Sequence, residues 1–202
     1  FPNLNLRNLI DSNDMELILS DDNFGDSSNP LEIAANNFLI NFGVIILYKK
    51  DQKDKARQLI KKSKINKETN ISFISSIQIQ GAKGLLAETP SESIKHYNKS
   101  ISLINEYGEK FETDSSLIWL KLRMIDTIGY QYRKQEKYDE SLDFLINQKI
   151  DNFAEILEPH FLQAAIDVYF DISKLKSGLY NMGTKETYAE GFPEARKAVE
   201  LL

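Results

Sequence analysis

Residues 31–202 show helical periodicity almost without interruption, and this feature constrains the fold more than any other. After Pro30, prolines occur only at positions 90, 159 and 193, and each of them can stand in the first turn of a helix. The periodicity predicts helices at 31–49, 53–64, 71–87, 90–106, 114–135, 138–149, 153–174, 177–189 and 193–202. The chain is therefore expected to be all-α, with successive helices joined into antiparallel hairpins by short connections.

Residues 1–30 have a different character. The sequence DSNDMELIL favours a short helix capped by Asp11 or Ser12, and the polar stretch that follows ends at Pro30. Asp21, Asn23 and Gly25 resemble part of a calcium loop, but the acidic spacing and the final Glu are missing. We expect an acidic, partly disordered N-terminal segment at 1–30 and one helical-repeat domain at 31–202. Because the first residue is Phe1, we expect this domain to be a fragment of a longer chain.

Four segments of the helical region can be aligned on a small residue early in the second helix of each hairpin. These small residues are Ala56, Ser93, Ser141 and Ala195. Small side chains let two antiparallel helices approach closely, and in the third segment Gly129 is expected to serve the same purpose. A hairpin of this kind cannot cover its apolar face alone, so neighbouring hairpins are expected to stack.

The segment IGYQYRKQEKYDESLDFL, and next ESIKHYNKSI, resemble the tetratricopeptide repeat family, and the resemblance covers residues 37–202. It implies a right-handed α-solenoid of antiparallel helical hairpins. The small sites are spaced by 37, 48 and 54 positions along the chain, whereas the family repeats about every 34 residues. Ser93 and Ser141 also replace the family's usual Ala. The excess length implies divergent repeats with longer helices or an added helix, for which the proline-free stretch HFLQAAIDVYFDISKLKS is the best candidate. A rival frame pairs 153–174 with one long helix over 177–202, and a non-repeating helical bundle is the alternative to both.

The resemblance also implies a binding site, because the first helices of tetratricopeptide repeats line a concave groove that binds peptides. The partner-binding positions it implies here are Asn41, Tyr48, Lys49, Gln78, Arg123, Asp126, Tyr130 and Arg133. Ile45, Ala82 and Leu85 fall on the same helices and are equally expected in the core. The family's clamp of Lys and Asn for chaperone C-termini is only fragmentary, so chaperone tails are disfavoured as ligands.

Catalytic motifs are missing from the sequence. The chain has no cysteine and two histidines, which excludes thiol nucleophiles, Cys-based zinc sites and multi-histidine metal centres. No HExxH, GxSxG or Walker-type GK[ST] motif occurs, and the glycines of GAKG are better explained by helix packing than by phosphate binding. We expect neither an enzyme nor a cofactor. The lack of cysteine fits an intracellular, cytoplasmic protein.

Charge is distributed unevenly along the chain. Residues 49–67 contain nine Lys or Arg and two Asp, whereas residues 1–35 contain seven acidic residues and one Arg. The basic stretch predicts a solvated helix face, a site for an acidic partner segment, or a site for the chain's own acidic tail. Nucleic acid is a less favoured partner because the net charge is −5 and no aromatic residues alternate with these lysines. No apolar run approaches the length of about 18 residues that a membrane-spanning helix needs, so we expect no membrane insertion.

These observations favour a non-enzymatic scaffold that binds a peptide or protein segment in a tetratricopeptide-like groove. A regulatory or assembly domain of a larger multidomain protein is the first alternative. An RNA-binding helical-repeat protein that uses the basic 49–67 stretch is the second.

Overall fold

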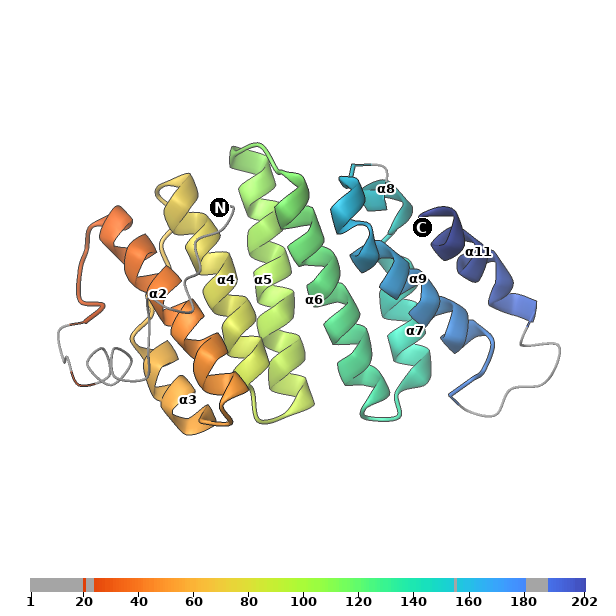
Figure 1. Cartoon of the computed structure of the whole chain (residues 1–202), viewed down its shortest axis with the longest axis horizontal. Coiled ribbons are helices and arrows are strands. Elements are labelled where there is room, and N and C mark those ends of the chain that lie inside the picture. The colour runs from red at the N-terminus through yellow and green to blue at the C-terminus, as the bar shows by residue number, and fades with distance from the viewer. Residues whose placement is uncertain (1–19, 21–23, 155, 181–188) are drawn as a thin grey trace. The chain divides into compact units, whose positions relative to one another are not determined.

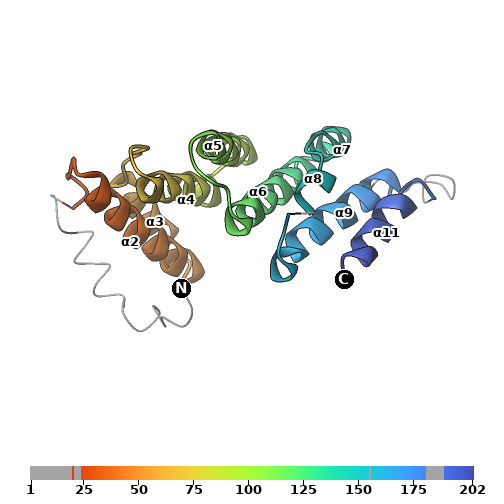
Figure 2. The ribbon, with the colours of Figure 1, turned by 90° about the horizontal axis from the view of Figure 1, so that it is seen from above.

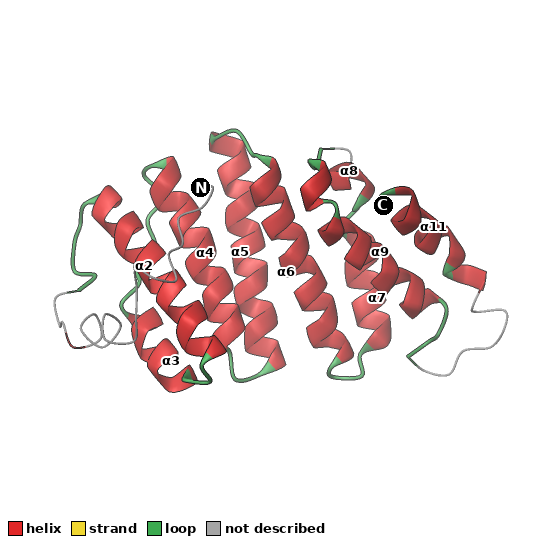
Figure 3. Cartoon of the chain, in the orientation of Figure 1, coloured by secondary structure: helices red, strands yellow, loops and turns green. Residues whose placement is uncertain are grey.

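The computed structural model describes residues 20, 24–154, 156–180 and 189–202. These residues contain helices and loops and no strand (Figure 3), so the prediction of an all-α chain is confirmed. The helices form two compact units, residues 1–87 and 88–202. The boundary lies inside the span 31–202 that we expected to form one domain. Most of the expected acidic segment 1–30 lies outside the described residues.

Unit 1 contains helices α2 (Pro30–Lys49), α3 (Lys53–Lys61) and α4 (Asn70–Leu86), with α2 packed on both of the others (Figure 1). Local signals fix the helix starts. The Asn29 side chain accepts a hydrogen bond from the Leu31 N–H, and Thr69 forms a capping box with Ser72. The core of the unit is a cluster of buried apolar residues from all three helices: Ile40, Val44, Leu47, Ala56, Leu59, Ile60, Ile79, Ala82 and Leu86.

Unit 2 contains α5 (Pro90–Lys110), α6 (Ser115–Arg133), α7 (Tyr138–Asn147), α8 (Asp151–Ala154), the 3₁₀ helix η2 (Pro159–Phe161), α9 (Gln163–Lys176) and α11 (Phe192–Glu200). Helix α6 is central, because it packs on α5, α7 and α9 (Figure 2). The prediction of one helix over 153–174 is wrong. Proline disfavours the helical conformation in the residue before it, so Glu158 is extended, Pro159 begins η2, and α9 begins four residues later.

Helices α2, α6 and α9 end in the same hydrogen-bonded turn. The backbone N–H donates to a carbonyl five residues earlier, from Gln52 to Leu47 at 2.8 Å, from Lys137 to Tyr132 at 3.1 Å and from Leu179 to Lys174 at 3.1 Å. One residue of each turn has a left-handed φ: Asp51 at 57°, Glu136 at 59° and Gly178 at 65°. This is the geometry of the Schellman motif, which satisfies carbonyls left over at a helix end. Helices α3 and α7 begin two residues after the left-handed position.

Helices α6 and α7 approach closely at the small residues that the sequence singled out. The buried Ser141 Oγ donates a 3.0 Å hydrogen bond to the Gly129 carbonyl. A Cβ atom placed on Gly129 would lie 3.0 Å from Leu145 Cδ2 and 3.2 Å from Arg133 Nη1. Glycine at position 129 therefore sets the separation of the two helices, as the sequence predicted.

The C-terminal helices differ from the predicted map. Helix α9 packs on α11, which is the pairing of the rival frame, but residues 177–180 form a turn, so one continuous helix over 177–202 is wrong. Most of the helix predicted at 177–189 lies outside the described residues. The contact is close at Gly191, where a Cβ atom would lie 2.3 Å from the Ser173 carbonyl oxygen. Ala198 of α11 is fully buried.

Candidate interaction surfaces

Apolar side chains are spread around the whole circumference of helix α2, yet those on one side of it are exposed. Leu31 is 58% exposed, and Phe38 and Ile45 are 38% and 37% exposed. These three residues are seven positions apart, so they form one stripe along the helix. Leu39 is exposed beside the stripe, and Phe42 and Ile46 are half-buried. A helix that is apolar all round is ordinarily buried on every side, so this face of α2 lacks a covering element among the described residues.

The predicted groove positions of unit 1 come together between α2 and α4. The side-chain amide of Asn41 donates to Gln78 Oε1 at 3.5 Å. Ile45 lies one turn from Asn41, and Leu85 lies two turns from Gln78, and both are more than a third exposed. Ala82, by contrast, is buried in the core cluster. The Asn41–Gln78 contact thus joins two partly apolar stripes.

Tyr48 and Lys49 lie at the C-terminal end of α2. Tyr48 packs against the core cluster of unit 1, and Lys53 Nζ lies 5.5 Å from the centre of its ring. Lys49 and Lys50 are exposed. Other cations of the 49–67 stretch bind acidic side chains of the same unit: Lys53 with Asp51 at 3.7 Å, Arg57 with Asp54 at 2.9 Å, and Lys64 with Asp26 at 3.8 Å. Lys64 Nζ also donates to the Ser27 carbonyl at 3.2 Å.

In unit 2, α9 binds both predicted arginines of α6. Arg123 Nη1 lies 2.7 Å from Asp167 Oδ2, and Arg133 Nη2 lies 2.5 Å from Asp171 Oδ2. The second ion pair is nearly buried, with side-chain exposures of 9% and 12%. These guanidinium groups therefore stabilise the α6–α9 contact, and a partner would have to compete with the aspartates.

Asp126 and Tyr130 are the other two predicted partner-binding residues of α6. Burial, followed by the hydrogen bond and the charge of Asp171, raises the pKa of Asp126 to about 6, although Arg123 and Arg133 act in the opposite direction. Two carboxyl groups in contact cannot both ionise cheaply, so one of them carries a proton below that pH. Tyr130 is 51% exposed, and the guanidinium of Arg133 lies 5.9 Å from its ring centre.

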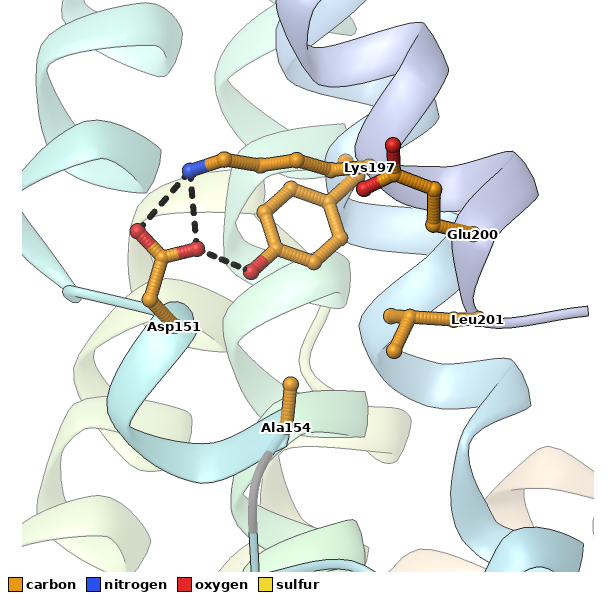
Figure 4. A pocket seen from close by; sticks show the side chains of 6 residues that line it. Asp151, Ala154, Lys197, Glu200 and Leu201 are labelled. Carbon is orange, nitrogen blue, oxygen red and sulfur yellow. Dashed lines mark hydrogen bonds and ion pairs between the residues drawn. The ribbon is translucent and has the colours of Figure 1, made fainter.

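A trio of polar residues, Asp151, Tyr169 and Lys197, lines an open pocket among α8, α9 and α11 (Figure 4). Lys197 Nζ lies 2.9 Å from both carboxylate oxygens of Asp151, and the Tyr169 hydroxyl donates to Asp151 Oδ1 at 2.5 Å. The bonds from Tyr169 and Lys197 lower the pKa of Asp151, while burial and the bond to Asp151 raise the pKa of Tyr169. Because its three members come from different helices and hydrogen-bond to one another, the trio ties α11 to α8 and α9.

Two further properties bear on the class of protein. Among the described residues, no three His, Asp or Glu side chains lie close enough to hold a metal ion. By length and composition, α2 is the one described helix that could cross a membrane, a test that core helices of soluble proteins also pass. In this structure its inner face packs in the core of unit 1.

Sequence reasoning missed the exposed residues Leu31, Phe38 and Leu39, and also Asp167 and Asp171. The exposure of Leu31, Phe38 and Leu39 could have been suspected from the sequence, because α2 has no polar face. A helix of that kind has to be covered by other elements on all sides. The signal for the two aspartates was their spacing of four, which places both on one face of α9. Nothing in the sequence paired that face with α6.

Comparison of the chain with protein-family models, with curated proteins and with solved structures gave no match.

Proposed function

We propose that this protein is a non-enzymatic protein-interaction module built from tetratricopeptide-like helical hairpins. Two observations support the repeat interpretation. Helices α2, α6 and α9 end in the same Schellman turn, and the second helices α3 and α7 follow it at the same distance. The small-residue contact of the family pattern is present at Gly129 and Ser141.

The exposed apolar face of α2 carries the proposal. Soluble proteins rarely leave a long contiguous apolar surface uncovered, and such surfaces commonly bind another protein. The polar clusters favour this proposal over catalysis, because the charged groups around Asp126 and Asp151 are occupied by ion pairs within the chain. In unit 2, Tyr130 is the predicted groove residue that keeps the most exposed surface.

Comparative affinity purification tests the proposal. The tagged full chain is recovered from the cells that produce it, beside the variants Phe38→Glu and Ile71→Glu, and the bound proteins are quantified by mass spectrometry. Ile71 is 46% exposed on α4 and serves as the matched control, because the same charge is added outside the α2 face. We expect Phe38→Glu to lose bound protein that wild type and Ile71→Glu retain. Equal recovery by all three proteins would refute the proposal.

A further inference from the structure

The exposed stripe of α2 is symmetric in its spacing about Phe38. Phe38 lies midway between Leu31 and Ile45, seven residues from each. In an antiparallel pair of α2 helices with Phe38 at the two-fold axis, Leu31 of one copy lies opposite Ile45 of the other. The same surface then serves both partners, which is the requirement for a symmetric dimer.

Charge at the two ends of the face is complementary in the same arrangement. Lys49 follows Leu31 by five full helical turns, and it therefore continues the apolar stripe at its C-terminal end, where Lys50 is also exposed. Glu32 and Asp26 lie at the N-terminal end. Glu32 is held there by a 2.5 Å hydrogen bond from Ser27 Oγ, and the Asp26 side chain is 74% exposed. An antiparallel pair brings the basic end of each helix beside the acidic end of the other.

We infer that a second copy of this chain covers the exposed face of α2, so that the protein forms a symmetric dimer through antiparallel α2 helices. This inference deepens the proposed function and rests on it, since it names the partner of the same surface. Between Leu31 and Ile45 the stripe runs for about 21 Å along one helix. An interface of one helix pair is expected to bury less than the roughly 1,200 Å² at which stable complexes begin. We therefore expect a dimer that forms at micromolar concentrations.

Sedimentation equilibrium of the full chain over a wide concentration range tests the inference. We expect wild type and Ile71→Glu to pass from monomer to dimer, and Phe38→Glu, which places two carboxylates at the two-fold axis, to stay monomeric. Circular dichroism verifies that the variants are folded. A wild-type protein that is monomeric at every concentration overturns the inference.

A charge exchange provides a second test that leaves the apolar stripe intact. Lys49→Glu places a carboxylate beside the acidic end of the second copy at Asp26, and Asp26→Lys places an ammonium group beside Lys49 of the second copy. Each variant alone is expected to dimerise about tenfold more weakly, whereas an equimolar mixture of the two restores dimerisation, because each end of the mixed dimer regains opposite charges. A mixture no tighter than the separate variants contradicts the antiparallel arrangement.

Cysteine cross-linking gives the orientation, and the cysteine-free chain makes it simple. Under mild oxidation Phe38→Cys should form a disulfide-linked dimer, and so should a mixture of Leu31→Cys with Ile45→Cys. Leu31→Cys alone should not. A monomeric Phe38→Cys protein whose thiol resists alkylation assigns the face to another segment of the same chain. Monomeric wild type that binds phosphatidylserine vesicles, with binding lost in Phe38→Glu, assigns it to a membrane surface. Both outcomes overturn the inference.

Failure of this inference can be told apart from failure of the proposed function. If wild type sediments as a monomer but Phe38→Glu still loses bound protein in the affinity purification, the partner is a different protein and the proposed function stands. If neither experiment distinguishes Phe38→Glu from Ile71→Glu, both proposals are wrong.

Discussion

The contact between α6 and α7 leaves no room for a large side chain at position 129, so Gly129→Leu should destabilise unit 2. A Cβ atom there already lies 3.0 and 3.2 Å from the two terminal methyl carbons of Leu145 and 3.2 Å from Arg133 Nη1. Leu145 is fully buried and Arg133 is held by Asp171, so neither can move aside freely. The hydrogen bond from Ser141 Oγ to the Gly129 carbonyl holds the two helices together at the same point.

The magnitude follows from two opposing effects. Replacing glycine inside a helix gains about 1 kcal/mol of intrinsic helix stability, and this gain roughly offsets the crowding from a single methyl group in Gly129→Ala. Leucine adds three more carbons where the nearest atoms are already in tight contact, and overpacking of this type costs about 1–3 kcal/mol. For a chain of this size that corresponds to a fall in Tm of about 2–12 °C.

Thermal melting followed by circular dichroism measures the effect, with urea unfolding as a second measure of the free energy of unfolding. Ser102→Leu is the matched control, because residue 102 is exposed on α5 and accepts the same side chain without crowding. That variant should stay within about 0.5 kcal/mol of wild type. A Gly129→Leu protein with an unchanged midpoint would show that α6 and α7 do not meet at this residue.

Three further changes probe unit 2. Ser141→Ala removes a buried hydroxyl and leaves the Gly129 carbonyl without that bond, so urea unfolding should show a loss of about 1–2 kcal/mol. Asp171→Ala removes the carboxylate that binds the buried Arg133, and the same measurement should show a loss of about 1–3 kcal/mol, because the carboxyl of Asp126 remains near that guanidinium. An unchanged midpoint would mean that the ion pair contributes nothing to stability. The raised pKa of Asp126 means that the folded protein binds a proton more tightly than the unfolded chain. Its contribution to stability is therefore complete below pH 4 and is lost as the pH rises through about 6. In Asp126→Asn, Tm measured between pH 4 and pH 7 should fall less with rising pH than in wild type, and parallel profiles would refute the shift.

Much of the fold could be read from the sequence because its signals are local. Capping residues, proline positions and helical periodicity depend on neighbours a few residues away, and the helices beginning at Pro30, Asn70 and Pro90 start within one residue of the predicted positions. The pairing of Gly129 with Ser141 was also predictable, since a close helix contact requires small residues on both sides.

The candidate site was harder to predict because it depends on which helices meet. Arg123 and Arg133 have the residue type and spacing of partner-binding side chains, and only the packing of α9 on α6 shows that Asp167 and Asp171 already bind them. The break at Pro159 likewise divides a stretch whose periodicity reads as one helix. The exposure of Phe38 depends on the arrangement of α3 and α4, which leave one side of α2 uncovered.

Hydroxyl-radical footprinting tests the central claim, that the exposed face of α2 is covered by protein in the functional assembly. Oxidation of Phe38 is measured by mass spectrometry in cells that produce the protein and in the purified chain diluted below micromolar concentration, with Ile71 as the internal reference. We predict that Phe38 is protected in cells and reacts readily after dilution, while Ile71 reacts equally in both. Equal oxidation of Phe38 in both conditions would contradict the claim.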